Sequence, residues 1–258
     1  MIETWTAFPA GILISTVVTS IGLGGGILWM PFFLIALKMN PETAVITSLL
    51  IQVAGMGSGS IAYIRQKQAE TGLAFIVFVA AIPGIIAGTL LAGRINLKLI
   101  ECILGFLMIG TALLFLLSQN RKKKALPYTN DLSQALKRKF TCLFILVPAL
   151  MSTASGMLSI SMGEWLVPLM KSRLSMTIHK AIATCIVITF WACITGSVTH
   201  LFMGARPDVG ILALAIPGVL IGGQLGPGIS NRIKDSAVQQ IFIIFLAFTG
   251  IYLVIKAL

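Results

Sequence analysis

The first residues that could do chemistry form a glycine-rich run, residues 21–31, in which Gly24, Gly25 and Gly26 follow one another. Each glycine destabilises a helix by about 1 kcal/mol relative to alanine, and Pro31 removes a backbone donor, so we expect a helix break here. If the run lies in a membrane, its opened peptide groups must line protein or a watery cavity. N–H groups at an opened helix bind anions without a charged side chain. The alternative is that the glycines only permit close helix packing.

An equivalent run in the second half, residues 155–168, carries serines where the first run carries glycines. Pro168 predicts a second helix break. Ser159 and Ser161, together with the backbone of Gly163, are candidates to donate hydrogen bonds to a polar solute. The sequence therefore predicts two broken helices that bind one solute.

Glu164 follows Gly163 near the centre of an apolar block. An acid inside a membrane is energetically costly and marks a functional position by default. Glu164 is therefore our candidate for a coupling site that gains and loses a proton. The alternative is that Glu164 pairs with Lys180, or with a backbone donor, and braces the break.

A helix with a polar stripe is expected after each break. Residues 40–42 are a typical helix start, Thr47, Ser48 and Gln52 follow them, and Thr184 takes the matching place in the second half. We predict that these four side chains line a cavity beside the breaks. Hydrogen bonding between helices, which is common for Ser and Thr in membranes, is an equally good interpretation.

Little else in the sequence suggests catalysis. There is no Ser/His/Asp arrangement, no pair of carboxylates and no metal-ligand spacing, so we expect no enzyme activity, no metal and no cofactor. The four cysteines form no C-x-x-C pair and are expected to be core residues. His179 and His200 lie at predicted segment boundaries, where solvation explains them better than a proton relay.

The composition indicates where these residues reside. Hydrophobic residues make up 57% of the 258-residue chain and charged residues 10%, against about 25% in soluble domains. Apolar blocks long enough to cross about 30 Å of hydrocarbon predict an all-α integral membrane protein in contact with the lipid bilayer. Glycine pairs four residues apart, such as Gly84 and Gly88 or Gly218 and Gly222, predict close helix packing. The apolar blocks are residues 8–37, 41–64, 72–92, 97–118, 140–170, 180–203, 209–228 and 236–258.

The net charge of +11 does not indicate a nucleic-acid partner, because the basic residues lie between the apolar blocks. This distribution is typical of the positive-inside rule, which keeps basic loops in the cytoplasm. Residues 119–139 contain two basic clusters and are predicted to form a cytoplasmic loop. The N-terminal residues lack a basic region and a cleavage site, so we expect them to be the first membrane segment.

The basic loop divides the chain into two similar membrane repeats, residues 1–118 and 140–258. Residues of the same type recur at a constant offset of 137, as in Gly26 and Gly163, Pro31 and Pro168, and Thr47 and Thr184. Duplicated halves are the common plan of secondary transporters. If the first segment of each repeat folds back on itself, more of the 19 Lys and Arg residues fall on the cytoplasmic side. We therefore predict inverted repeats whose first segments are broken or re-entrant.

The chain resembles the sulfite exporter TauE/SafE family over nearly its whole length. The resemblance is carried by Gly22-x-Gly24-Gly25-Gly26-x-x-x-x-Pro31, by Ala44-Val45-Ile46-Thr47-Ser48, and by their repeats at Gly163-x-x-x-x-Pro168 and residues 179–185. It implies a permease of the cytoplasmic membrane for sulfite, sulfonates or other small sulfur anions. The second half departs from the family pattern at Ser161-Met162-Gly163, and Glu164 adds an acid that would disfavour a dianion.

Together these features predict a secondary transporter for a small anion in the cytoplasmic membrane. The anion would bind between the repeats at residues 24–26 and 159–163, with Thr47, Ser48 and Thr184 in support. An anion channel, or a membrane assembly or signalling partner with no flux of its own, are the alternatives. The sequence leaves the direction of transport, the coupling ion and the oligomeric state open, so a homodimer and proton coupling are both compatible with it.

Overall fold

A computed structural model describes residues 4–92, a few positions between 105 and 116, and residues 141–257 except 160 and 175. Most of the predicted block 97–118, and the whole basic loop 119–139, lie outside the described residues. The side chains of Pro31 and Glu164 also lie outside them, although the backbone of both residues is described. The predicted boundaries of the basic loop therefore stay predictions.

All regular elements of the described residues are helices, as the predicted all-α fold requires. Five of these helices are long and apolar enough to cross a membrane, so the chain is an integral membrane protein. The long helices are α1 (Ala7–Ile21, preceded by the 3-10 turn η1, Thr4–Thr6), α3 (Pro41–Arg65), α4 (Thr71–Leu91), α7 (Thr141–Leu158), α9 (Ile178–Phe202), α10 (Val209–Ser230) and α11 (Asp235–Ala257). The shorter elements are α2 (Gly26–Pro31), the π-helix η2 (Phe32–Ala36) and α8 (Gly163–Leu174).

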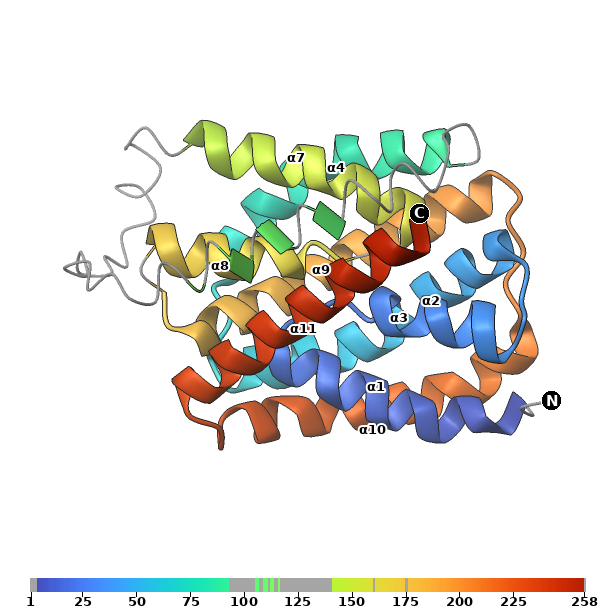
Figure 1. Ribbon diagram of the computed structural model, residues 1–258, viewed down its shortest axis with the longest axis horizontal. Helices are drawn as coiled ribbons and strands as arrows, with labels where there is room; N and C mark the ends of the chain where they lie inside the picture. Colours follow the sequence, from blue (N-terminus) through green and yellow to red (C-terminus); the bar gives the residue numbers. More distant parts are fainter. Residues whose placement is uncertain are drawn as a thin grey trace.

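Helices of each half pack against helices of the other half. α1 packs along α10 and α7 packs along α4, so the first helix of each half lies against a helix of the other half (Figure 1). α3 likewise contacts α10, α9 contacts α4, and α3 and α9 contact each other. Each contact that a first-half helix makes with the second half therefore has a counterpart made by the matching second-half helix. The core lies between the two halves.

Helices at matching positions run in opposite directions. Lys180, near the start of α9, bonds Glu70, just before α4, and Asn231, just after α10, bonds Gln68, just after α3. One end of the molecule thus holds the start of α9 and the end of α3, and Figure 1 shows the two helices running antiparallel. At the other end, the Asp208 N–H before α10 donates to Thr47 Oγ1 near the start of α3, at 3.0 Å.

Both predicted helix breaks are present and buried. α1 ends at Ile21 and is followed by Gly22, whose φ of 82° closes the helix in the left-handed region, where glycine is unstrained. α7 ends at Leu158 and is followed by Ser159, at the matching position, with a φ of 58°. A left-handed backbone is uncommon for serine, so neighbouring contacts must hold Ser159 in place.

The breaks do not lie at the prolines, and in this respect the sequence prediction is wrong. Pro168 lies inside α8, and Pro31 is the last residue of α2, after which the chain continues as η2. A proline removes only one N–H from the helix ladder, so helical structure continues through Pro168 in α8 and from Pro31 into η2. The clustered glycines and the left-handed residues open the chain instead.

After each break the chain returns to the end from which it came. Phe33 in η2 packs in one cluster with Ala7, Ala44 and Ile211, which lie near the starts of α1, α3 and α10. In the second half, α7 runs parallel to α4, and α8 leads back to the start of α9 beside Lys180. In the described residues, the first segment of each half is therefore a helical hairpin, and the two hairpins begin at opposite ends of the molecule.

Glycines allow the hairpin helices to pack closely, as the sequence predicts. A Cβ on Gly84 or Gly88 of α4 would collide with carbonyl oxygens of α7, and one on Gly218 or Gly222 of α10 would collide with those of α1. Small residues at such interfaces let backbones approach in membranes, where no hydrophobic force drives helices together.

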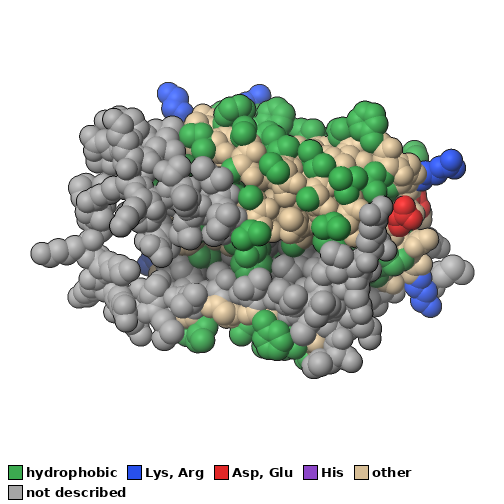
Figure 2. Space-filling model, turned by 90° about the horizontal axis from the view of Figure 1, so that it is seen from above, with side chains coloured by type: hydrophobic (Ala, Val, Ile, Leu, Met, Phe, Trp, Pro, Cys, Tyr) green, Lys and Arg blue, Asp and Glu red, His purple; other side chains and the backbone are tan. Residues whose placement is uncertain are grey.

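The outer surface is apolar. Phe75, Phe202, Val209 and Phe248 are all more than half exposed. In the part of the face in Figure 2 that the structure describes, hydrophobic side chains are spread over the surface and charged ones lie toward its edges. A soluble protein rarely exposes so much contiguous apolar area, so lipid is the medium that fits it.

Gly218→Ala should destabilise the protein, because its Cβ would collide with the Phe8 carbonyl oxygen. Overpacking of this kind costs about 1–3 kcal/mol. Gly228→Ala in the same helix is the matched control, since nothing lies within 4 Å of its Cβ. Thermal unfolding in detergent should show a lower Tm for Gly218→Ala and an unchanged or higher Tm for the control. Equal Tm values would contradict the α1–α10 packing.

Candidate functional site

The two hairpins touch each other at equivalent residues. A Cβ on Gly24 would collide with the side chain and the backbone of Ser161, its counterpart at an offset of 137, and a Cβ on Gly163 would collide with the Gly22 carbonyl oxygen. Glycine is the residue that permits so close an approach. Gly24 and Gly163 therefore allow the two breaks to meet in the interior.

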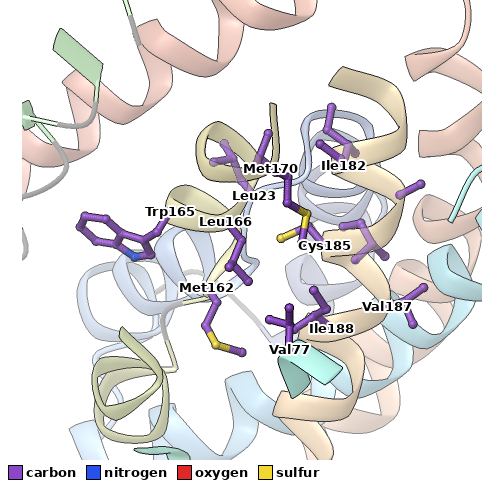
Figure 3. Packing of buried hydrophobic residues seen from close by; sticks show 14 of the residues in the cluster. Leu23, Val77, Met162, Trp165, Leu166, Met170, Ile182, Cys185, Val187 and Ile188 are labelled. Atoms are coloured by element: carbon purple, nitrogen blue, oxygen red, sulfur yellow. The ribbon is translucent and has the colours of Figure 1, made fainter. Parts of the chain in front are cut away.

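Apolar side chains seal the tips of the hairpins. Met162, Leu166 and Met170 of the second hairpin are buried in one cluster with Leu23 of the first. Figure 3 shows Leu166 directed toward Val77 and Ile188. The tip of each hairpin is thus embedded in protein, as membrane burial of non-helical backbone requires.

Gln52 of α3 connects the first half to the second break. Its Nε2 lies 2.7 Å from Ser159 Oγ and 3.1 Å from Ser48 Oγ, and the Ser159 hydroxyl donates to Ser48 Oγ at 3.1 Å. All three residues are buried, with Gln52 only 2% exposed. This network holds Ser159 in its left-handed conformation, and it brings together three of the predicted site residues.

Ser161, which lies within the second break, stabilises it with its hydroxyl. Its hydroxyl accepts the Gly163 N–H at 2.9 Å and so caps the start of α8. The same hydroxyl lies 3.1 Å from Thr189 Oγ1 of α9. Thr189 is the counterpart of Gln52 at an offset of 137, so the second break is bonded by polar side chains at the same position of α3 and of α9.

A small cavity lies on the first-hairpin side of this network. Its walls include Gly25, Trp29, Gln52, Gly55 and Ser15, and the space open to the centre of a water molecule is about 10 Å³. That is room for about one water, so a solute of several heavy atoms requires the walls to move apart. Gly25 leaves this space open, since a Cβ there would lie 2.9 Å from the Gln52 side chain. Gly26, the next residue, begins α2.

The predicted residues Thr47 and Thr184 are placed away from this cavity. Thr47 Oγ1 accepts the Asp208 N–H, and Thr184 Oγ1 accepts the Glu70 N–H, both at 3.0 Å. Each threonine thereby satisfies a backbone donor at the start of a helix from the other half. Their placement differs from the predicted contact with a solute and agrees with the alternative, hydrogen bonding between helices.

Two side chains tether the hairpins near their breaks, and sequence reasoning missed both. The Tyr63 hydroxyl donates to the Thr19 carbonyl oxygen at 2.8 Å, and His200 Nε2 lies 2.8 Å from the Gly156 carbonyl oxygen. Tyr63 and His200 are counterparts at an offset of 137, as are Thr19 and Gly156. His200 is only 6% exposed, so the expected boundary solvation is wrong for it. The offset of 137 residues pairs Tyr63 with His200, and this pairing is the sequence signal that could have identified the role of His200.

Lys180 Nζ lies 3.3 Å from Glu70 Oε1, at the end of the molecule where α9 begins. Both side chains are more than a third exposed, so this ion pair contributes little to stability. The side chain of Glu164 lies outside the described residues, and its predicted coupling role and alternative pairing stay predictions. Within the ranges that the structure describes, no group of three or more His, Cys, Asp and Glu side chains could hold a metal ion.

A multi-pass helical protein in which broken helices from two halves meet in the interior has the architecture of a membrane transporter. The sulfite exporter TauE/SafE family model matches residues 7–253, and the chain belongs to that family. A relative, the probable membrane transporter protein YunE of Bacillus subtilis (strain 168), is 28% identical over 96% of both chains. No solved structure matches the chain.

Thr184→Val should lower the Tm in detergent, because it leaves the Glu70 N–H without its acceptor. This hydrogen bond is half-buried, so its loss should cost about 0.5–1.5 kcal/mol. Thr195→Val in the same helix is the control, since among the described residues the Thr195 hydroxyl bonds only the carbonyl oxygen of Trp191 in its own helix. Equal stability of the two variants, with solute binding lost in Thr184→Val alone, would favour a direct contact with the solute instead.

Proposed function

We propose that the protein is a secondary transporter that moves a small anion across the cytoplasmic membrane. Sulfite, a sulfonate or a related sulfur anion is the substrate class that its family name suggests. The observation that carries the proposal is the meeting of two buried helix breaks at Gly24 and Ser161, beside the Gln52 network. The protein acts as a permease in this proposal, not as an enzyme.

The breaks supply hydrogen-bond donors for an anion. Peptide N–H groups at residues 24–26 and at the start of α8, with the hydroxyls of Ser159, Ser161 and Ser48, surround the place where the hairpins meet. Helix starts and hydroxyls bind oxyanions without a fixed counter-charge. Glu164, which directly follows Gly163 in the sequence, stays our candidate for proton coupling.

Transport would follow from movement of one half against the other. We take the two halves to be inverted repeats, since their matching helices run in opposite directions and their contacts are reciprocal. The cavity beside Gln52 admits about one water, so the conformation described here is an occluded one. Rocking of the hairpins against α3 and α9 would open the site to one side and then to the other.

The end that holds Lys67, Lys180, Arg232 and Lys234 is the proposed cytoplasmic end. Polar contacts join its loops, including Gln68 Nε2 to Asn231 Oδ1 at 2.8 Å. The positive-inside rule favours this orientation, which also places the basic loop 119–139 in the cytoplasm. A homodimer and proton coupling stay compatible with the proposal.

Gly25→Leu should abolish transport while leaving membrane insertion intact, because the side chain would fill the cavity between Gln52 and Trp29. Gly228→Leu adds the same bulk where nothing lies within 4 Å of the Cβ and is the control. The measurement is sulfite or sulfonate flux into proteoliposomes that contain equal amounts of each protein. Full activity of Gly25→Leu would remove the site from the transport pathway.

Flux should also saturate with solute concentration, as expected if each transport cycle moves bound solute. A linear dependence would favour the channel alternative. Absence of flux from purified protein that co-purifies with another subunit would favour an assembly or signalling role. Thermal-shift screening of sulfite, thiosulfate, sulfonates and carboxylates identifies the solute to use.

A further inference from the structure

Gln52 carries a hydrogen-bond acceptor that no described group satisfies. Its Nε2 lies 3.3 Å from the carbonyl oxygens of both Ser48 and Ser159. Carbonyl oxygens only accept, so these two contacts favour the orientation in which the amide nitrogen faces them. Gln52 Oε1 is then left buried, and it has no partner in the described part of the chain.

The side chain that carries this acceptor belongs to the wall of the cavity. Gln52 lines the cavity together with Gly25 and Trp29, and a Cβ on Gly25 would lie 3.3 Å from the Gln52 amide carbon. A buried acceptor without a donor is strongly unfavourable, and such a group in a native structure requires an explanation. A donor inside the cavity supplies one: a water when the site is empty, and a group of the solute when the solute replaces that water.

The cavity wall also limits the charge of the solute. None of the ten residues that line the cavity is charged. The solvation energy of an ion scales with the square of its charge, so a dianion is about four times as costly to desolvate as a monoanion of the same size. Peptide and hydroxyl donors can compensate a single charge far more readily than two.

We infer that the site takes a singly charged anion that also bears a hydrogen-bond donor, which Gln52 Oε1 accepts. Protonated oxyanions and hydroxyl-bearing sulfonates belong to this class, and sulfate, a dianion without a donor, does not. Peptide donors of the first break, beside Gly25, bind the anionic oxygens, while Gln52 Oε1 accepts the hydrogen bond of the proton-bearing group. This inference rests on the proposed function, because it specifies the substrate class of the same site.

The test compares three probes on the purified full-length protein at one pH. 2-Hydroxyethanesulfonate and propane-1-sulfonate have the same charge and the same number of heavy atoms, and differ in the donor. Thermal shift should give a Kd for the hydroxyl probe at least about tenfold lower, as one buried hydrogen bond warrants, and sulfate should bind more weakly than either. Proteoliposome flux should rank the probes in the same order.

Gln52→Lys provides the matched variant. The lysine ammonium keeps N–H donors for the serine oxygens, removes the acceptor and adds a positive charge. The preference for the hydroxyl probe should disappear, and sulfate should gain affinity relative to propane-1-sulfonate. If this variant does not fold, the comparison of the two sulfonates on the unmodified protein decides the inference alone.

The outcomes separate the inference from the transport proposal. Equal affinity for the two sulfonates overturns the inference and leaves the transporter proposal standing, provided that either probe is transported. A hydroxyl preference that persists in Gln52→Lys also overturns the assigned role of Gln52. Absence of binding and flux for all three probes and for sulfite overturns both proposals.

Discussion

The structure depends on one constraint: peptide groups that leave a helix inside a membrane must find partners within the protein. Each hairpin meets this constraint through the other half. Gly24 and Ser161 bring the two breaks into contact, Gln52 of the first half holds Ser159 of the second, and Leu23 of the first hairpin is buried among second-half side chains. Neither half could bury its break alone, so the solute site that we propose exists only between them.

Divergence between matching positions makes the interior asymmetric. Gly25 leaves a cavity beside Gln52, whereas its counterpart Met162 fills the equivalent space and joins the apolar core (Figure 3). Gln52 itself is matched by the shorter Thr189. In the described residues, this cavity therefore lies on the first-hairpin side of the interior, which suits a single asymmetric solute better than two equivalent ones.

Local chemistry explains which features could be predicted from sequence. The first break, the packing glycines and the start of α3 each follow from glycine or proline residues close together in the chain. The hydrogen-bond partners of Thr47, Thr184 and His200 lie at or on other helices, far away in the sequence. No local sequence pattern therefore predicts them. Pro31 and Pro168 misled the prediction because the neighbouring helical turns absorb one missing N–H.

The re-entrant path of the two hairpins is tested most directly by labelling single cysteines with a membrane-impermeant thiol reagent in a background without native cysteines. The positions are Asn40, Lys67, Arg206 and Arg232, all exposed at the ends of the bundle. The account predicts that Asn40→Cys and Arg206→Cys label from one side, and Lys67→Cys and Arg232→Cys from the other. If Asn40→Cys labels with Arg232→Cys, and Lys67→Cys with Arg206→Cys, each first segment crosses the membrane once and the account is contradicted.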